Sequence, residues 1–330
     1  MNIYIIYNYW EILLSLLVLE NSKNEDSILL IVENEIEEKI ISRLEEKYKI
    51  IKFNFSPNRI LRFLFFYYKV NYFLPHKLNF LLSNVKRIVS FSDHDAITQY
   101  FIKNKKYVDL YEHGGVNYKV EFNEIDQKIK EIIFRMKKPY GRSEYVRNIY
   151  LRGTGEIPED IKEKVKLIEL EELWNTIDKE SRNRILEIFG LDLKKLEAIG
   201  RKSVILFTQP FSEDRVITEK EKIDLYKKIV KNYNRNELII KNHPREKTNY
   251  EKIFSDITIL ERGFPSELLT LVGIKIKKVI TISSTAISIF SKKAEIDFYG
   301  TEIHPKILKY FGNIDFFMKR NKFIDKEQNE

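Results

Sequence analysis

Short apolar runs alternate with helical patterns along most of the chain. The expected strands are Ile3–Tyr7, Ile28–Val32, Ile50–Phe53, Val85–Phe91, Tyr107–Tyr111, Ser203–Thr208, Leu238–Lys241, Ile257–Leu260, Lys278–Ile282 and Glu295–Phe298. The expected helices are Trp10–Leu19, Glu35–Lys47, Asn58–Tyr72, Ala96–Lys103, 177–190, Glu219–Tyr233, Tyr250–Phe254, Ser266–Val272 and Thr285–Phe290. Strands separated by helices form βαβ units, which build parallel sheets. The sequence therefore predicts an α/β fold.

A break in this alternation divides the chain into two domains. At 330 residues the chain is longer than one core usually spans. Residues 123–150 lack clear turns, and Arg152–Pro158 contains two glycines and a proline, as linkers do. We therefore expect domains at 1–155 and 156–330, with two sheets facing each other across a cleft and the last helix packing back on the first domain.

The composition indicates in which compartment the protein works and what charge its ligands carry. The chain has no cysteine, which excludes disulfides and thiolate sites and fits a reducing cytoplasm. We expect the first residues to form a strand and a helix and not a signal peptide, and no apolar run reaches the roughly 18 residues that span a membrane. The net charge of +8 favours anionic partners such as phosphorylated sugars, nucleic acid or an acidic membrane surface.

Polar residues follow the strand Leu238–Lys241. His243 and Pro244 come directly after it, between the cations Lys241 and Arg245. An imidazole in this position can bind a phosphate oxygen or protonate a leaving phosphate. A structural hydrogen bond of a loop histidine is the alternative.

Two more strand ends carry candidate ligand groups. Ser283, Ser284 and Thr285 follow a strand and open a helix, where hydroxyls and free N–H groups bind anions, although one of them can simply cap the helix. Glu267 begins another helix, where it can stabilise the helix dipole or accept hydrogen bonds from two ribose hydroxyls.

Two loops are candidates for the catalytic base. The loop Thr208–Asp214 offers Asp214, or else is an acidic loop before a Thr218 helix cap. In the first half, Glu112 and His113 end a strand and precede Gly114, as an ordinary turn would also do.

Two further stretches have competing explanations. Asp93-His94-Asp95 has carboxylates spaced for a metal, but it directly precedes a helix, so we favour helix capping. The basic and aromatic stretch Arg59–Lys69 can lie on an anionic membrane or bind single-stranded nucleic acid, and we favour a buried helix with a charged edge.

The order of these pieces resembles the bacterial sialyltransferases of glycosyltransferase family 52, which make lipooligosaccharide sialosides. The motifs that carry the resemblance are Tyr7-Asn8-Tyr9-Trp10, Tyr111-Glu112-His113-Gly114, Thr208-Gln209-Pro210, His243-Pro244, Pro265-Ser266-Glu267 and Ser283-Ser284-Thr285. The resemblance implies a GT-B fold of two Rossmann-like domains. It also implies inverting, metal-independent transfer of sialic acid from CMP-sialic acid to a terminal galactose of a lipooligosaccharide or other surface glycan, without a cofactor.

The resemblance assigns roles to these motif residues. His243 would contact or protonate the CMP phosphate, Glu267 would bind the ribose, and Ser283 with Ser284 would bind the phosphate. The implied substrate-binding set is Tyr7, Asn8, His113, Gly114, Thr208, Gln209, Pro244, Glu267, Ser283, Ser284 and Thr285.

The resemblance leaves two candidates for the catalytic base, Asp214 and Glu112. Related sialyltransferase families place the base in an acidic-acidic-Gly motif, from which Glu112-His113-Gly114 departs at its middle position. In family 52 the base is an aspartate upstream of the His-Pro motif, which favours Asp214 over Glu112.

The resemblance further suggests a homodimer and peripheral contact with the inner face of the cytoplasmic membrane, without nucleic acid. The alternatives are another nucleotide sugar, such as a glucosyl donor, or a non-catalytic binder of membranes or nucleic acid.

Overall fold

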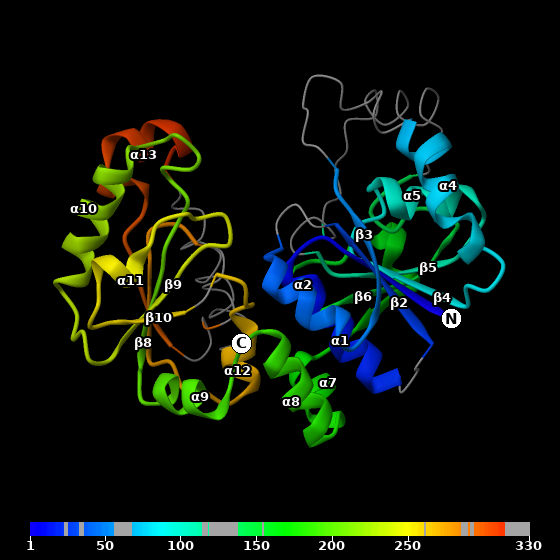
Figure 1. Cartoon of the computed structure of the whole chain (residues 1–330). Coiled ribbons are helices and arrows are strands. Elements are labelled where there is room, and N and C mark those ends of the chain that lie inside the picture. Colours follow the sequence, from blue (N-terminus) through cyan, green and yellow to red (C-terminus); the bar gives the residue numbers. More distant parts are fainter. Residues whose placement is uncertain are drawn as a thin grey trace, which may run out of the picture. The chain divides into compact units, whose positions relative to one another are not determined.

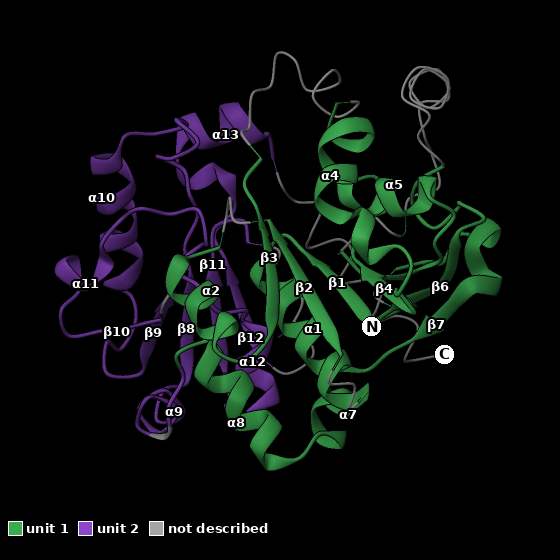
Figure 2. Cartoon of the chain, turned by 45° about the vertical axis from the view of Figure 1, so that its right-hand side comes forward, with its two compact units in different colours: residues 1–190 green, residues 191–330 purple. Residues whose placement is uncertain are grey.

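A computed structural model of the chain describes residues 1–22, 26–32, 36–55, 68–113, 118, 138–153, 155–260, 262–284, 290 and 294–313. The chain forms two compact units, Met1–Gly190 and Leu191–Glu330, which Figure 2 shows in different colours. Within the described residues, each unit contains one sheet, and all strand pairs in both sheets are parallel. The predicted α/β class is confirmed.

The first unit holds a sheet with seven described strands in the order β3-β2-β1-β4-β5-β6-β7. The strands are β1 (Asn2–Ile6), β2 (Ser27–Val32), β3 (Lys49–Phe53), β4 (Arg87–Ser90), β5 (Val108–Tyr111), β6 (Val146–Leu151) and β7 (Val165–Leu167). The helices are α1 (Tyr9–Ser22), α2 (Glu38–Glu45), a π-helical turn (Lys69–Phe73), α4 (Leu74–Leu78), 3₁₀ turns (Asn79–Leu81 and Glu159–Lys164), α5 (Ala96–Lys103), α7 (Leu170–Thr176) and α8 (Lys179–Ile188).

Burial on both faces explains the apolar sequence of the central strands. All five residues of β1 are buried. Ile3 and Ile5 pack with Leu74 of α4 and with Tyr100 and Phe101 of α5 in one apolar cluster. Successive side chains of a strand point to opposite faces, so the remaining residues of β1 face the other side. Helices α1, α2, α7 and α8 lie together in both views (Figures 1 and 2) and pack on one another.

The second unit holds a smaller sheet, with five described strands in the order β10-β9-β8-β11-β12. The strands are β8 (Val204–Phe207), β9 (Leu238–Lys241), β10 (Thr258–Leu260), β11 (Lys278–Thr281) and β12 (Glu295–Phe298). The helices are α9 (Leu193–Gly200), α10 (Glu219–Val230), α11 (Tyr250–Ile253), α12 (Glu267–Leu271), a 3₁₀ turn (Thr301–Ile303) and α13 (Pro305–Phe311). Helix α10 begins with a capping box in which Thr218 and Glu221 cap each other, so the predicted Thr218 cap is confirmed.

The predicted domain boundary near residue 155 is wrong, because the first unit continues to Gly190. The glycine-containing stretch is a turn inside the first sheet: Gly153 has a φ of +69°, and β7 beyond it pairs with β6. Helices α7 and α8 then pack on α1, which fixes them to the first unit. Glycine and proline are typical of turns within a domain as well as of linkers between domains, so these residues could not distinguish the two.

Some expected elements differ or lie outside the described residues. Strand β6 begins inside the stretch 123–150, for which no strand was expected, and ends at Leu151; β7, α7 and α9 were also not anticipated. The last described helix, α13, packs through Ile307 into the core of the second unit. Of the basic and aromatic stretch, residues 59–67 are not described, and neither is the terminal segment 314–330. The prediction of a buried helix there therefore lies outside the described residues. In the segment that follows, Tyr68 and Tyr72 are more than half exposed, whereas Val70 and Leu74 are buried.

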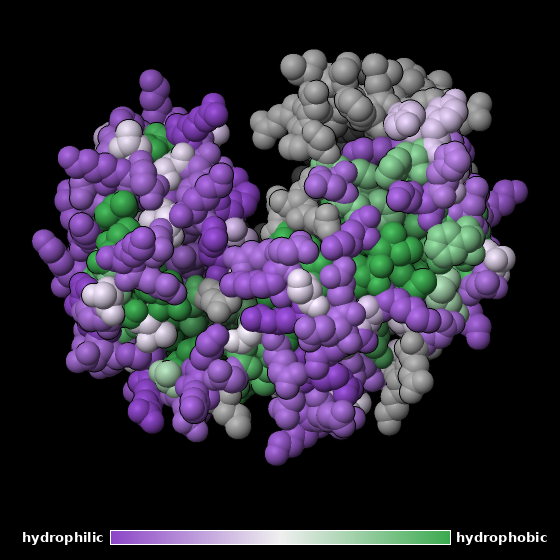
Figure 3. Space-filling model, viewed as in Figure 1, coloured by the Kyte–Doolittle hydropathy of each residue, from purple (hydrophilic) through white to green (hydrophobic). Residues whose placement is uncertain are grey.

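Charged and polar side chains make up most of the face shown in Figure 3, consistent with a charged fraction of 32%. Within the described residues, no helix combines the length and apolar character needed to cross a membrane.

Candidate active site

The carboxyl ends of four neighbouring strands in the second unit carry most of the predicted site residues. The register aligns Phe207 of β8 with Lys241 of β9 on one side and with Thr281 of β11 on the other, so the loops that follow begin at one level. The strand order reverses between β8 and β11, and ligands of open α/β sheets bind at such a switch point. The predicted residues in these loops and in the helix after β10 are Thr208, Gln209, Asp214, His243, Pro244, Glu267, Ser283 and Ser284.

His243 is a neutral imidazole in a cationic setting. Burial is the main cause that lowers its pKa to about 4, and Arg245 and Lys241 lower it further. Its Nδ1 accepts the backbone N–H of Arg245 at 3.2 Å, so the ring proton lies on Nε2. His243 can therefore donate one hydrogen bond from Nε2 to an anion that the neighbouring cations attract.

A buried carboxylate that the sequence analysis did not identify joins two of these loops. Glu246 is fully buried and accepts the backbone N–H of His243 at 2.8 Å and the hydroxyl of Thr208. Tyr250 donates a further hydrogen bond at 2.9 Å, and the fully buried ammonium of Lys222 lies 3.5 Å away. Because Lys222 lies on α10, far from Glu246 in sequence, no local sequence motif predicts their ion pair.

Asp214, one of the two candidate bases, lies in the loop after β8 and contacts Arg245, two residues after His243. Arg245 binds its carboxylate through both guanidinium Nη atoms, at 2.6 and 3.1 Å. The Asp214 side chain is about a quarter exposed. This two-point contact holds the carboxylate in one orientation.

The remaining predicted groups of the second unit have local backbone roles. The N–H of Gln209 donates to the hydroxyl of Tyr226 at 2.7 Å, and the N–H of Ser284 donates to the hydroxyl of Thr281 at 2.8 Å. Glu267 is the first residue of α12, where its charge favours the helix dipole. Thr285 and the first-unit residue Gly114 lie outside the described residues.

In the first unit, Glu112 is part of a buried ion pair. The side chain is fully buried, and Arg152 donates three hydrogen bonds to it, from its backbone N and from Nε and Nη2, at 2.7 to 3.0 Å. Tyr118 donates a fourth at 2.6 Å. Four hydrogen bonds are directed at these carboxylate oxygens and the side chain is shielded from solvent, which argues against Glu112 as the base.

His113, the next residue, contacts a different carboxylate. Its Nδ1 lies 2.7 Å from Oε1 of Glu11, a fully buried residue in the first turn of α1. Glu11 also accepts the backbone N–H of Tyr7 at 2.6 Å and the side-chain amide of Asn8 at 3.1 Å. Asn8 in turn accepts the N–H of Glu11, so the predicted residue Asn8 caps α1. The spacing Asn8-x-x-Glu11 is a capping-box signal that could have identified Glu11 from sequence.

The tyrosine of this cluster bridges two loops. Tyr7 follows β1 and donates its hydroxyl to Asp95, after β4, at 2.6 Å. The strand order of the first sheet reverses between β1 and β4, so this cluster lies at the switch point of the first unit.

The capping hypothesis for Asp93-His94-Asp95 is confirmed. Asp95 caps α5 by accepting the N–H groups of Ile97 and Thr98. Asp93 accepts the N–H groups of Tyr140 and Gly141 at 2.6 and 2.7 Å, and burial raises its pKa to about 6. Among the described residues, no group of three His, Asp or Glu side chains is arranged to hold a metal ion.

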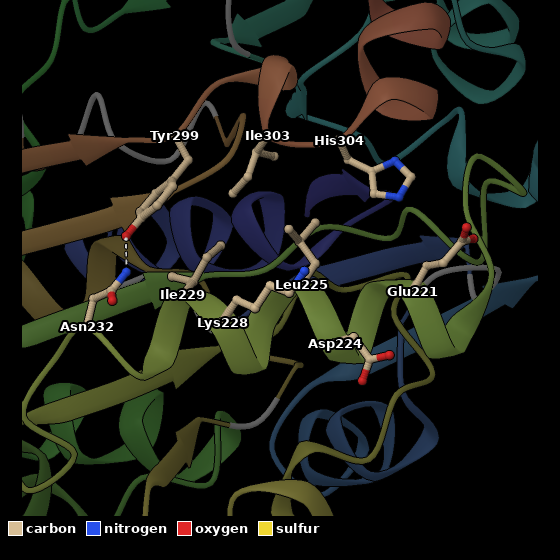
Figure 4. Close-up of a pocket in the computed structure, with 9 residues that line it drawn as sticks. All are labelled: Glu221, Asp224, Leu225, Lys228, Ile229, Asn232, Tyr299, Ile303 and His304. Carbon is tan, nitrogen blue, oxygen red and sulfur yellow. Dashed lines mark hydrogen bonds between the residues drawn. The ribbon is translucent and has the colours of Figure 1, made fainter.

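A cavity of about 330 Å³ elsewhere in the second unit contains none of the predicted residues. Figure 4 shows it along α10, with Tyr299 and Asn232 joined by a hydrogen bond of 3.4 Å. Its lining residues are Glu221, Asp224, Leu225, Lys228, Ile229, Asn232, Tyr299, Ile303 and His304. We therefore place the candidate active site at the strand ends and not in this cavity.

Two all-parallel α/β units, each with polar loops at its switch point, define a glycosyltransferase fold of the GT-B type. The chain belongs to glycosyltransferase family 52, whose model matches residues 24–307. An uncharacterized protein of Haemophilus influenzae is 40% identical over 229 residues, which cover 69% of this chain and 73% of that protein.

Solved sialyltransferases share this fold. One is a 2,6-sialyltransferase of Vibrionaceae Photobacterium sp. JT-ISH-224, solved with the donor product CMP and the acceptor substrate lactose; it has a TM-score of 0.60 and 12% identity, over 89% of this chain and 70% of that chain. Another is the GT-B domain of a Photobacterium damselae sialyltransferase, with a TM-score of 0.56 and 11% identity, over 89% of this chain and 90% of that chain. At these identities the similarity shows the fold.

Proposed function

We propose that the chain is an inverting sialyltransferase that moves sialic acid from CMP-sialic acid to a terminal galactose of a lipooligosaccharide or other surface glycan. The observation that carries this proposal is the position of His243, at a strand end between Lys241 and Arg245 in a chain of family 52. The related fold of a sialyltransferase that binds CMP and lactose supports the choice of donor and acceptor.

The donor is proposed to bind the second unit through its nucleotide. His243 donates Nε2–H to the phosphate, and Ser283 with Ser284 binds it from the neighbouring loop. Glu267 accepts hydrogen bonds from the ribose hydroxyls, while Thr208 and Gln209 line the cytidine side. Glu246 supports this arrangement, because it holds Thr208 and the backbone of His243 together.

The proposed reaction is one displacement at the anomeric carbon. The acceptor oxygen attacks, the bond to the phosphate breaks, and negative charge gathers on the departing CMP. The cations Lys241 and Arg245 and the hydrogen bond from His243 stabilise that charge. CMP carries a single phosphate, so we propose that the reaction needs no metal, since the charge to be neutralised is smaller than that of a leaving diphosphate.

A donor screen tests the proposal. Purified protein is incubated with lactose and with CMP-sialic acid, UDP-glucose or an ADP-sugar, and product is followed by mass spectrometry. We expect sialyl-lactose with CMP-sialic acid alone. Transfer from another sugar nucleotide, with none from CMP-sialic acid, would overturn the sialyl assignment and leave a related glycosyltransferase.

Matched histidine variants separate catalysis from binding by charge. We expect His243→Ala to lower transfer by about 10²- to 10⁴-fold, the range of a lost proton donor or oxyanion contact. His76→Ala, at an exposed position of α4, is the control. A non-catalytic binder of membranes or nucleic acid would instead show salt-sensitive binding that survives both substitutions and no transfer.

Assembly and location follow the family in this proposal. We propose a homodimer that works at the cytoplasmic face of the inner membrane on a lipid-linked glycan. Light scattering gives the mass in solution, and co-sedimentation with phosphatidylglycerol vesicles measures membrane contact. A monomer that does not bind these vesicles would refute the proposed dimer and membrane contact, but not the proposed reaction.

A further inference from the structure

Residues 68–81 of the first unit form one continuous helical segment with two different faces. The π-helical turn, α4 and a 3₁₀ turn follow one another in it. Its inner face is buried in the apolar cluster of the first unit and carries Val70, Leu74, Leu78 and Leu81. Its outer face is aromatic, because Tyr68, Tyr72 and Phe80 are 55%, 58% and 64% exposed. Residues four and eight positions apart lie on one side of a helix, so these three side chains form an aromatic line along its surface.

The sequence around this aromatic line is strongly basic. Residues 47–92 contain nine Lys and Arg and no Asp or Glu, although the whole chain has 49 Asp and Glu among 330 residues. Lys77 is exposed on α4. Lys103, in the last turn of α5, donates a hydrogen bond to the side chain of Asn71, and α4 and α5 lie side by side (Figures 1 and 2). The next acids in the sequence precede the other end of α5, which Asp95 caps.

The arrangement of the rings favours a membrane over single-stranded nucleic acid as the anionic partner. Single exposed aromatic residues are common, but a group of them beside cations is typical of a binding surface. Tyr68 and Tyr72 stack on each other, with ring centroids 5.9 Å apart and planes at 23°, so each covers one ring face that a nucleobase would use. A membrane needs no free ring face, because the ring lies among the lipid headgroups and the tyrosine hydroxyl stays in water.

We propose that this aromatic line, with Lys77 and Lys103, is the surface by which the first unit binds an anionic lipid bilayer. The inference rests on the membrane contact in the proposed function and adds the place of that contact, but it does not depend on the proposed reaction. The three rings enter the headgroup region, and the two ammonium groups stay at the level of the lipid phosphates. Because the inner face of the segment packs in the core of the first unit, little conformational entropy is lost when the outer face binds.

Co-sedimentation of the full chain with lipid vesicles measures this binding. We expect the wild type to bind vesicles of phosphatidylglycerol and phosphatidylcholine more tightly than vesicles of phosphatidylcholine alone. The difference should shrink as the salt concentration rises, because salt screens the attraction between the lysines and the anionic lipid. Equal binding to the two kinds of vesicle would overturn the proposal.

Two double variants of exposed apolar side chains locate the surface. Tyr72→Ser combined with Phe80→Ser should weaken binding to the anionic vesicles by at least about 10-fold, since two rings no longer leave water. The matched control is Leu308→Ser combined with Tyr310→Ser on α13, where the side chains are 36% and 63% exposed, and it should bind as the wild type does. Equal losses in the two double variants, or no loss in the first, would overturn the proposal.

A charge variant tests the basic part of the surface without changing the aromatic line. At low salt, Lys77→Gln should weaken binding to the anionic vesicles about five-fold, the effect of one lysine near an anionic membrane. Lys309→Gln, in the last turn of α13, is the control and should have no effect. The same loss in both variants would show that binding follows net charge and not this surface.

The sequence contains no cysteine, so one position can be labelled at a time. A polarity-sensitive fluorophore on Phe80→Cys should shift its emission to shorter wavelength when anionic vesicles are added, and spin-labelled lipid should quench it. The same fluorophore on Tyr310→Cys should show neither response. Vesicle-bound protein in which the label on Phe80→Cys does not respond would overturn the proposal.

Transfer to lactose, a soluble acceptor, separates failure of this inference from failure of the proposed function. Tyr72→Ser combined with Phe80→Ser should transfer sialic acid to lactose as the wild type does. A wild type that binds anionic vesicles but transfers no sialic acid would refute the proposed reaction and support the membrane surface. A wild type that transfers sialic acid but does not bind these vesicles would overturn the membrane surface alone.

Two other occupants of this surface are outcomes of the same experiments. Binding of a single-stranded oligonucleotide in place of vesicles, lost in the Tyr72→Ser and Phe80→Ser double variant, would assign the surface to nucleic acid. A dimer that this double variant converts to a monomer while vesicle binding survives would assign the surface to a second copy of the chain. Either result would overturn the proposal.

Discussion

Replacement of Lys222 by methionine should strongly destabilise the second unit. The ammonium is fully buried, 2.8 Å from Glu213 and 3.5 Å from the fully buried Glu246. Methionine keeps much of the aliphatic stem but removes the charge, which leaves Glu246 without its cation. Breaking a buried ion pair from one side costs about 3–5 kcal/mol. Hydrogen bonds from Thr208 and Tyr250 remain on Glu246, so we expect about 3 kcal/mol, the lower end of that range.

The matched control is Arg235→Met, which removes an exposed ion pair with Asp256 in the same unit. Exposed pairs contribute about 0–1 kcal/mol. Urea unfolding followed by hydrogen exchange of peptides from residues 191–313 reports this unit directly. At about 1–3 kcal/mol per molar urea, the Lys222→Met midpoint should fall by about 1–3 M and the control by well under 1 M. Equal shifts in the two variants would refute the reasoning, and Glu246→Gln added to Lys222→Met should recover part of the loss.

Three further predictions concern pH, a turn and a helix cap. Burial holds the pKa of His243 at about 4, below its ordinary 6.5, so protonation favours the unfolded chain. The free energy of unfolding should therefore fall as the pH drops from 6.5 towards 4. In His243→Asn, the free energy of unfolding from chemical denaturation should depend less on pH over this range. Gly141→Ala should lower the free energy of unfolding by about 1–3 kcal/mol, because φ is +84° and a Cβ would overlap the side chain of Ile149. Gly200→Ala, at the end of helix α9 with open space around it, should raise that free energy by about 0.5–1 kcal/mol in thermal melts. Thr218→Ala should cost about 1 kcal/mol by removing the α10 cap, and unchanged helix protection in hydrogen exchange would contradict it.

Most of the fold could be predicted from the sequence, because the spacing of apolar residues and the residues that cap helices or form turns indicate where strands and helices lie. The strand Leu238–Lys241 and the helix Ala96–Lys103 agree residue for residue with the structure. Strand β6 was missed because its sequence Val-Arg-Asn-Ile-Tyr-Leu mixes charge into a strand near the edge of the sheet. The boundary was misplaced because the turn after β6 has the composition of a linker.

The sequence also placed the polar loops, but not the partners of their side chains. His243 could be located because a strand precedes it. The contacts of Glu246 with Lys222, and of Glu11 with His113, join residues far apart in sequence, and each depends on which strands become neighbours in the sheet. Whether a carboxylate is exposed or enclosed by an arginine, as Glu112 is, follows from the same packing and not from local spacing.

Glu246 has a consequence for the timing of ligand binding. It accepts the hydroxyl of Thr208 and the backbone N–H of His243, and so ties the loops after β8 and β9 to each other. A ligand that enters between these loops therefore loses little free energy to ordering them. We expect association at this end of the second sheet to occur in one kinetic step, with affinity set mainly by the rate of release.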